Sequence, residues 1–167
     1  MNTRRLTRIS ILISMSLTMF LFESLIPMPI LPPGAKLGLS NIVIIIALYI
    51  LASEVDALIV LIVRIILSAV FVGSPIVLIF SLSGGMLSFA VMAILKFTKS
   101  FSIIGVSAAG GFFHNVGQIL VAILVMDSWQ IINYLTVLGI CGVFTGAIIG
   151  IISNEVVKHI PSSKVTL

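Results

Sequence analysis

Long apolar stretches make up most of this chain, and short groups of proline, glycine or charged residues separate them. A helix that crosses a lipid bilayer needs about 20 predominantly apolar residues. The pattern therefore predicts an all-α fold, a polytopic membrane protein built as a six-transmembrane-helix bundle. The expected spans cover residues 6–26, 39–51, 57–72, 76–95, 104–126 and 130–152, within a single membrane domain of residues 1–167. The second and third are short, so partial re-entry into the bilayer and extension by polar ends are both open.

The composition agrees with a membrane environment. Of the 167 residues, 60% are hydrophobic and 8% are charged, and the mean hydropathy is +1.35. Soluble domains carry about 25% charged residues and keep a large surface in water. The composition therefore excludes a soluble enzyme, a nucleic-acid-binding protein and a disordered tail. The net charge of +4 comes from Lys and Arg that mostly flank apolar runs, which indicates loop anchors in a lipid bilayer and no nucleic-acid partner.

The basic residues predict the orientation of the chain. With six spans, seven of the nine fall on one side: Arg4, Arg5, Arg8, Lys96, Lys99, Lys158 and Lys164. The positive-inside rule then places both termini in the cytoplasm and the protein in the cell membrane. We expect the first helix to be retained rather than cleaved as a signal peptide, because it lacks an A-x-A-like site and is followed directly by Glu23.

Arg64 is expected in the middle of the third span, between Val63 and Ile65. A charge inside the bilayer is costly and usually faces a cavity or a partner. Glu23, near the outer end of the first span, is the candidate counter-ion for a structural clamp. Alternatively, Arg64 holds an anionic group of a ligand, since its planar guanidinium suits a carboxylate or a phosphate.

Three further polar residues gather in the fifth span. His114 and Gln118 are four residues apart and share a helix face, with Asn115 on its flank. These groups need hydrogen-bond partners, which neighbouring helices or a ligand in a polar pocket can supply. One His with amides is a poor ligand set for a metal ion, and the single Cys141 offers no thiolate cluster, so we expect no metal site.

A glycine pair interrupts the fourth span. Gly84 and Gly85 permit either a helix break or a very close backbone contact. Broken helices in the middle of the membrane commonly mark binding sites in transporters. In that case Ser83, just before the glycines, would face the ligand.

The loop before the second span contains four prolines (Pro27, Pro29, Pro32 and Pro33) and Gly34, and Lys36 follows them. This lysine is expected at the outer mouth of the protein, where it either meets an anionic ligand or serves as an interface lysine on a stiff connecting loop. Ser40 or Asn41 is expected to cap the helix that follows.

Small residues at four-residue spacing mark two further helix faces. A flat groove in the sixth span is formed by Gly142, Gly146 and Gly150. A ridge in the first span is formed by Ser10, Ser14 and Thr18. Both faces are interpreted as packing surfaces within the bundle or, alternatively, as docking surfaces for another membrane protein.

Together these segments resemble a known family. The runs PGAKLGLSN (33–41), SLSGG (81–85), G-x-S-x-x-G-G (105–111) and HN-x-x-Q (114–118), with an arginine in the third span, are similar to the Gx transporter family, also described as heptaprenyl diphosphate synthase component I. The resemblance implies a small bacterial membrane protein with a six-helix bundle, like the substrate-binding S components of energy-coupling factor (ECF) transporters. Such components dock on a transmembrane coupling subunit through small residues of the first helix, and the resemblance assigns this role to the serine and threonine ridge.

No catalytic residues and no cofactor are expected. Prenyl transfer needs Mg²⁺ held by clustered carboxylates, whereas the five acidic residues of this chain never cluster beyond Glu54 and Asp56. The phosphate-binding pattern G-x-x-x-x-G-K-[ST] does not occur in the sequence, so we do not expect ATP hydrolysis.

The leading functional hypothesis is a substrate-binding component of a vitamin-type or small-metabolite importer, powered by separate ECF transmembrane and ATPase subunits. Its expected ligand-binding residues are Arg64, His114, Asn115, Gln118, Lys36 and Ser83. The alternative is a non-catalytic membrane subunit of heptaprenyl diphosphate or quinone biosynthesis that carries an isoprenoid-like ligand. A purely structural membrane scaffold is the third hypothesis.

Overall fold

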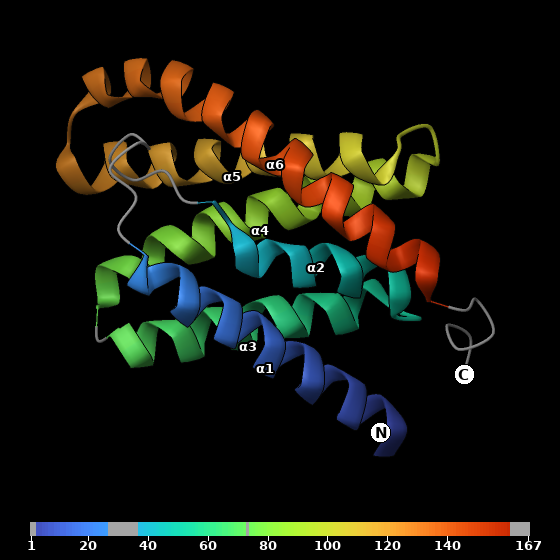
Figure 1. Ribbon diagram of the computed structural model, residues 1–167. Helices are drawn as coiled ribbons and strands as arrows, with labels where there is room; N and C mark the ends of the chain where they lie inside the picture. The colour runs from blue at the N-terminus through green and yellow to red at the C-terminus, as the bar shows by residue number, and fades with distance from the viewer. Residues whose placement is uncertain (1–2, 27–36, 73, 161–167) are drawn as a thin grey trace.

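The computed structural model describes residues 3–26, 37–72 and 74–160. Over these residues the chain is all-helical, as the hydrophobic pattern predicts (Figure 1). The α-helices are α1 (Thr3–Leu25), α2 (Leu39–Ile50), α3 (Glu54–Val72), α4 (Pro75–Thr98), α5 (Ile103–Met126) and α6 (Tyr134–His159), and a short 3₁₀ helix, η1 (Trp129–Asn133), precedes α6. The expected helical bundle is thus confirmed for the described part of the chain.

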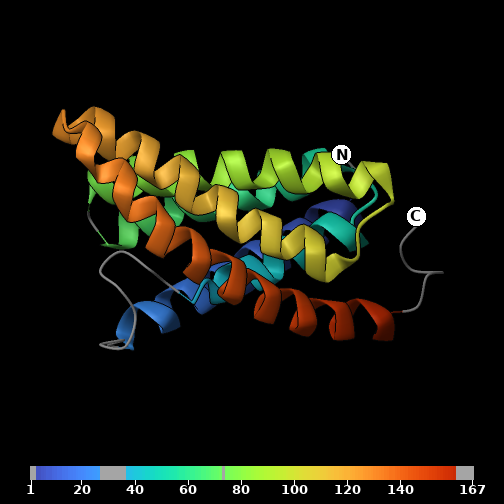
Figure 2. The same cartoon turned by 90° about the horizontal axis from the view of Figure 1, so that it is seen from above.

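Successive α-helices run in alternating directions, so the start of α1 and the end of α6 lie at the same end of the bundle (Figures 1 and 2). We call this end the terminal end and the other the opposite end. The most extensive packing joins α5 to α6 and to α4. On the other side of the bundle α1 packs on α2 and α3, and α2 also contacts α6.

The hydrophobic core is centred on α2. Residues 43–48 of this helix are all buried, whereas a helix at the surface of a bundle buries only one face. The other helices expose large apolar side chains on their outer faces, for example Phe97 (87% exposed), Leu124 (80%) and Phe144 (68%). An apolar core with an apolar exterior fits a protein whose surrounding solvent is lipid.

Five of the described helices, with η1 and α6 taken together, are long and apolar enough to cross a membrane. The chain is therefore a multi-pass membrane protein. The exception is α2, whose 12 residues reach about 18 Å, against a hydrocarbon core about 30 Å thick. The helix α3 begins at Glu54 rather than at residue 57, because Glu54 and Asp56 occupy its first turn, where acidic side chains are favourable.

Ion pairs tie the helices together at the terminal end. The Arg5 Nε atom donates a hydrogen bond of 2.8 Å to Asp56 on α3, and an η nitrogen of Arg5 bonds the second carboxylate oxygen. The Lys96 Nζ atom on α4 donates to Glu54 (2.9 Å) and to the carbonyl of Leu48 (2.7 Å). The two acidic residues that are close in sequence are therefore both held by basic partners.

Candidate ligand-binding site

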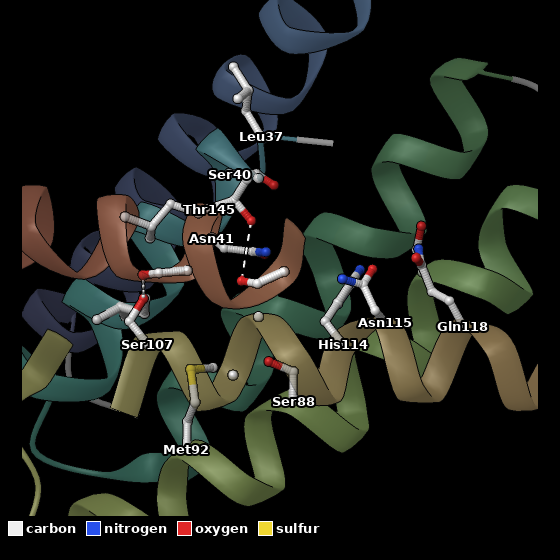
Figure 3. A pocket seen from close by; sticks show the side chains of 18 of the residues that line it. Leu37, Ser40, Asn41, Ser88, Met92, Ser107, His114, Asn115, Gln118 and Thr145 are labelled. Carbon is white, nitrogen blue, oxygen red and sulfur yellow. Dashed lines mark hydrogen bonds between the residues drawn. The ribbon is translucent and has the colours of Figure 1, made fainter. Parts of the chain in front are cut away.

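A cavity of about 80 Å³ lies inside the bundle, and all six α-helices contribute residues to its lining (Figure 3). Its position follows from the short length of α2. Ser16, in the middle of α1, donates a hydrogen bond of 3.0 Å to the Ser40 carbonyl, and Arg64, in the middle of α3, donates one of 3.4 Å to Asn41. The first turn of α2 therefore lies inside the bundle, beside the cavity. We call this cavity the central pocket.

Four of the six expected ligand-binding residues line the central pocket: Arg64, His114, Asn115 and Gln118. They come from two helices that are separated in the sequence, so the fold brings them together. Ser83 is not among the lining residues, because its hydroxyl donates to the carbonyls of Phe80 (3.2 Å) and Gly117 (3.0 Å) between α4 and α5. Lys36, and with it the expected mouth of the pocket, lies outside the described residues.

Arg64 is deeply buried, with 5% of its surface exposed. One of its η nitrogens donates to the side-chain oxygen of Asn41 at 3.4 Å. Its Nε atom has no hydrogen-bond partner within the described residues. A guanidinium carries five N–H donors, so this arrangement leaves a strong donor beside the pocket.

Of the two alternatives for Arg64, the salt bridge with the candidate counter-ion Glu23 is not found among the described residues, although the charge of Glu23 attracts the guanidinium electrostatically. Its carboxylate instead accepts hydrogen bonds from the backbone N–H groups of Gly38 (2.7 Å) and Leu39 (3.0 Å). Glu23 therefore caps the N-terminus of α2 from a neighbouring helix. Its negative charge lies where the helix dipole is positive, which stabilises both.

The expected cap of α2 by Ser40 or Asn41 is wrong. The N-cap residue is Gly38, whose φ of 77° lies in the left-handed region that favours glycine, and α2 has no cap from a local side chain. The side chain of Asn41 is thereby available to accept from Arg64. Asn41 thus belongs to the central pocket, and only the tertiary packing assigns it there.

The polar residues of α5 both pack against neighbouring helices and line the central pocket. The Asn115 amide donates a hydrogen bond of 2.7 Å to the Leu138 carbonyl on α6, so part of its capacity is used between helices. His114 and Gln118 are half-buried and pack against Gly84 of α4, where a Cβ atom would meet both side chains at 3.0 Å. Figure 3 shows these three side chains extending from the same helix, α5.

The glycine pair of the fourth span produces close contact and not a break. The helix α4 continues from Pro75 to Thr98. A Cβ atom on Gly84 would lie 2.7 Å from the His114 carbonyl, and one on Gly117 would lie 2.7 Å from the Ser83 carbonyl. Of the two expectations for this segment, the close backbone contact is confirmed and the break is wrong.

The lining contains hydroxyl groups that the sequence analysis did not single out as binding residues. They are Ser40, Ser81, Ser88, Ser107 and Thr145. Serine and threonine are common in membrane helices, where they bond backbone carbonyls of the same or a neighbouring helix. Ser107 does this with the carbonyl of Gly146 on α6. Their presence in the sequence therefore gave no signal that distinguishes a pocket residue from a packing residue.

The small-residue ridge lies on the outer face of α1. Ser10, Ser14 and Thr18 are all exposed, and the Thr18 hydroxyl bonds the Ser14 carbonyl at 2.8 Å. A shallow groove runs along the same face, with Ile11 and Met15 among its residues. The ridge is thus accessible to a partner helix, although no partner is seen on it.

Within the described residues, no group of three or more His, Cys, Asp or Glu side chains could hold a metal ion. Four of the five acidic residues already have partners. They are Glu23 with α2, Glu54 with Lys96, Asp56 with Arg5, and Glu155 with Lys158. Among the described lining residues, the central pocket therefore offers hydrogen-bonding side chains, with Arg64 among them, and not a cluster of free carboxylates.

The chain was compared with known protein families, curated proteins and solved structures. A family model described as heptaprenyl diphosphate synthase component I matches residues 12–156, which reach from α1 into α6 and include all the described residues of the central pocket. Neither the curated proteins nor the solved structures include a match to this chain.

Proposed function

Because the chain belongs to the heptaprenyl diphosphate synthase component I family, we propose that it is a non-catalytic membrane subunit of a prenyl diphosphate synthase. The family match carries this proposal. The subunit holds a small ligand or the head of an amphiphilic one in the central pocket, and a soluble prenyltransferase acts at its cytoplasmic face. Both chain termini, and hence the terminal end of the bundle, face that partner.

The acidic residues support a non-catalytic role. Elongation of a prenyl diphosphate requires Mg²⁺, and this hard cation prefers several carboxylate oxygens in one place. The carboxylates with known partners lie on α1, α3 and α6 and are engaged by backbone N–H groups or basic side chains. The partner subunit therefore supplies the carboxylates that the reaction needs.

The central pocket supports a binding role for the membrane subunit. Arg64, Asn41, His114 and Gln118 supply hydrogen-bonding groups to a cavity of about 80 Å³. A cavity of this size holds several water molecules or one small polar group. It accommodates a head group or a small metabolite, and the chain of a long isoprenoid would extend beyond it. Lys36 and Asn115 complete the proposed set of ligand contacts. Asn115 contributes the hydrogen-bonding groups that its bond to the Leu138 carbonyl on α6 does not use.

Co-purification and product analysis test this proposal. The protein is extracted in mild detergent together with the soluble prenyl diphosphate synthase of the same cell. We expect the two to elute together and the chain length of the prenyl product to change when the membrane subunit is present. Separate elution with an unchanged product would contradict the proposal.

Two variants that each remove one exposed charge test where the soluble prenyltransferase binds. Lys99→Gln removes an exposed charge at the terminal end, and Asp127→Asn removes one at the opposite end. If the soluble partner binds at the terminal end, Lys99→Gln weakens co-elution and Asp127→Asn leaves it unchanged. Equal effects of both variants would place the partner elsewhere.

The second candidate function is uptake of a small metabolite as an S-component-like subunit of an ECF transporter. The observation that favours it is a polar pocket enclosed by all six helices, together with the exposed ridge of Ser10, Ser14 and Thr18 on α1. Transport predicts accumulation of a metabolite in vesicles that also contain transmembrane and ATPase subunits. Replacing Ser14 by Leu would then stop uptake, whereas Phe144→Leu on the lipid-facing side of α6 would not.

A further inference from the structure

The Nε atom of Arg64 is the one buried side-chain nitrogen or oxygen without a hydrogen-bond partner within the described residues. Arg64 is 5% exposed, it lines the central pocket, and its one described hydrogen bond, to Asn41, is long at 3.4 Å. A buried N–H donor that lacks an acceptor is costly. The geometry therefore requires an acceptor beside the Nε edge of the guanidinium.

The charges around Arg64 indicate the charge of the acceptor that this side chain binds. Among the described lining residues Arg64 is the only Lys or Arg, and Glu23 is the only acidic residue. Both oxygens of Glu23 accept from the first turn of α2, whose helix dipole compensates part of its charge. Arg64 is thus left with one positive charge and no ion-pair partner among the described residues.

On the premise of the proposed function, in which the central pocket holds a ligand, we propose that Arg64 binds a single carboxylate of that ligand. The Nε and one η nitrogen present two parallel N–H groups, whose spacing matches the two oxygens of a carboxylate. Asn41 accepts a long hydrogen bond of 3.4 Å from one η nitrogen of Arg64, and the hydroxyls of Ser88 and Thr145 lie in the same lining, where they can contact the polar remainder of the ligand.

One positive charge selects a singly charged group over a diphosphate. A diphosphate brings at least two negative charges, and burying the surplus charge beside Glu23 is unfavourable at low dielectric. The ligand of this pocket is therefore a small carboxylic acid, and the prenyl diphosphate itself binds at the catalytic partner.

Arginine side-chain NMR tests the proposal directly. The protein is labelled with ¹⁵N-arginine, and its Nε–Hε signals are recorded in detergent while butyrate, butyramide or inorganic diphosphate is added. The Arg64→Lys variant assigns the Arg64 signal by its disappearance. Signals of Arg4, Arg5 and Arg8, all at the start of α1, serve as internal controls in the same sample.

We expect butyrate alone to move the Arg64 Hε signal downfield, in a saturable way, while the three control signals stay in place. A stronger response to diphosphate, an equal response to the neutral amide, or no response to any probe would overturn the proposal. These outcomes leave the proposed partnership with a prenyltransferase intact, because co-elution and product chain length measure it independently.

A second variant supplies the carboxylate within the protein. Asn41→Asp places a carboxylate oxygen where Arg64 now contacts an amide oxygen. We expect this variant to lose the response to butyrate, because the guanidinium is already paired. Asn41→Asp protein that still responds to butyrate like the parent would show that the carboxylate does not bind at Arg64.

Discussion

The contact between α5 and α6 and the first turn of α2 both place polar groups inside an apolar bundle, but they use them differently. At α5–α6, Ser107 and Asn115 donate to the carbonyls of Gly146 and Leu138, so donors and acceptors match. At the first turn of α2, Arg64 keeps a donor without a described partner. The comparison teaches that a polar residue in a membrane helix indicates binding only where its hydrogen bonding is incomplete.

Backbone proximity explains why the α5–α6 contact is complete. A Cβ atom on Gly111 would lie 2.0 Å from the Gly142 carbonyl oxygen, and one on Gly146 would lie 2.6 Å from the Ser107 carbonyl oxygen. Small residues let helices approach so closely that side chains reach carbonyls of the next helix, and such packing drives helix association in lipid. The described bond of Arg64 to α2 runs instead between two side chains, from the guanidinium to Asn41.

The largest expected effect comes from filling the α5–α6 contact. Gly111→Ala introduces a methyl group into a space already occupied by backbone. Because backbone cannot move aside as a flexible side chain can, we expect a loss of about 3 kcal/mol in the free energy of unfolding. Unfolding in a denaturing detergent, followed by circular dichroism, measures this loss.

Gly105→Ala is the matched control on the same helix. A Cβ atom on Gly105 would lie 3.6 Å from its nearest neighbour, the Ser102 hydroxyl, which is an ordinary van der Waals contact. Alanine favours a helix over glycine by about 1 kcal/mol, so this variant is expected to be as stable as the parent or more stable. If Gly111→Ala and Gly105→Ala had the same free energy of unfolding, close backbone packing would not be what holds α5 to α6.

The next effect concerns the cap of α2. Glu23→Ala removes an acceptor that bonds two backbone N–H groups, those of Gly38 and Leu39. Leaving these donors unpaired inside the bundle costs about 2 kcal/mol, and we expect faster amide hydrogen exchange at both residues. Glu155→Ala, which removes an acid from an exposed pair with Lys158, serves as the control and is expected to change neither stability nor exchange. Unchanged exchange in Glu23→Ala would show that Glu23 does not cap α2.

The helices could be predicted from the sequence because the bilayer fixes their length and composition. The predicted fifth span, 104–126, differs from α5 by one residue at its start. The burial of Arg64 followed in the same way, since apolar residues surround it on both sides. Each of these features depends on residues that are close together in the chain.

The bonding partners could not be predicted, because they depend on contacts between distant segments. Glu23 precedes Gly38 by 15 residues, and nothing in the local sequence distinguishes a cap for α2 from a counter-ion for Arg64. Ser83 next to a glycine pair fits a broken binding helix and a tight helix contact equally well. The packing of Gly84 against α5 decides for the contact.

The smallest expected effect on stability comes from Arg64→Met, and this variant separates the two interpretations of the buried charge. In a structural clamp, removing Arg64 would leave Glu23 as an uncompensated buried charge and cost about 3–5 kcal/mol. In the structure the backbone N–H groups of α2 already hold Glu23. Methionine of similar length also removes an unpaired donor, so we expect a change of less than about 1 kcal/mol.

Arg5→Met completes the comparison in the same unfolding assay. Arg5 is 48% exposed at its side chain, but it pairs with Asp56, whose side chain is 5% exposed. If pairing decides the outcome, the exposed arginine matters more for stability than the buried one, and Arg64→Met stays close to the parent while losing the response to butyrate. A larger loss of stability for Arg64→Met than for Arg5→Met would show that Arg64 holds the bundle together, and the ligand would then have to be sought elsewhere in the central pocket.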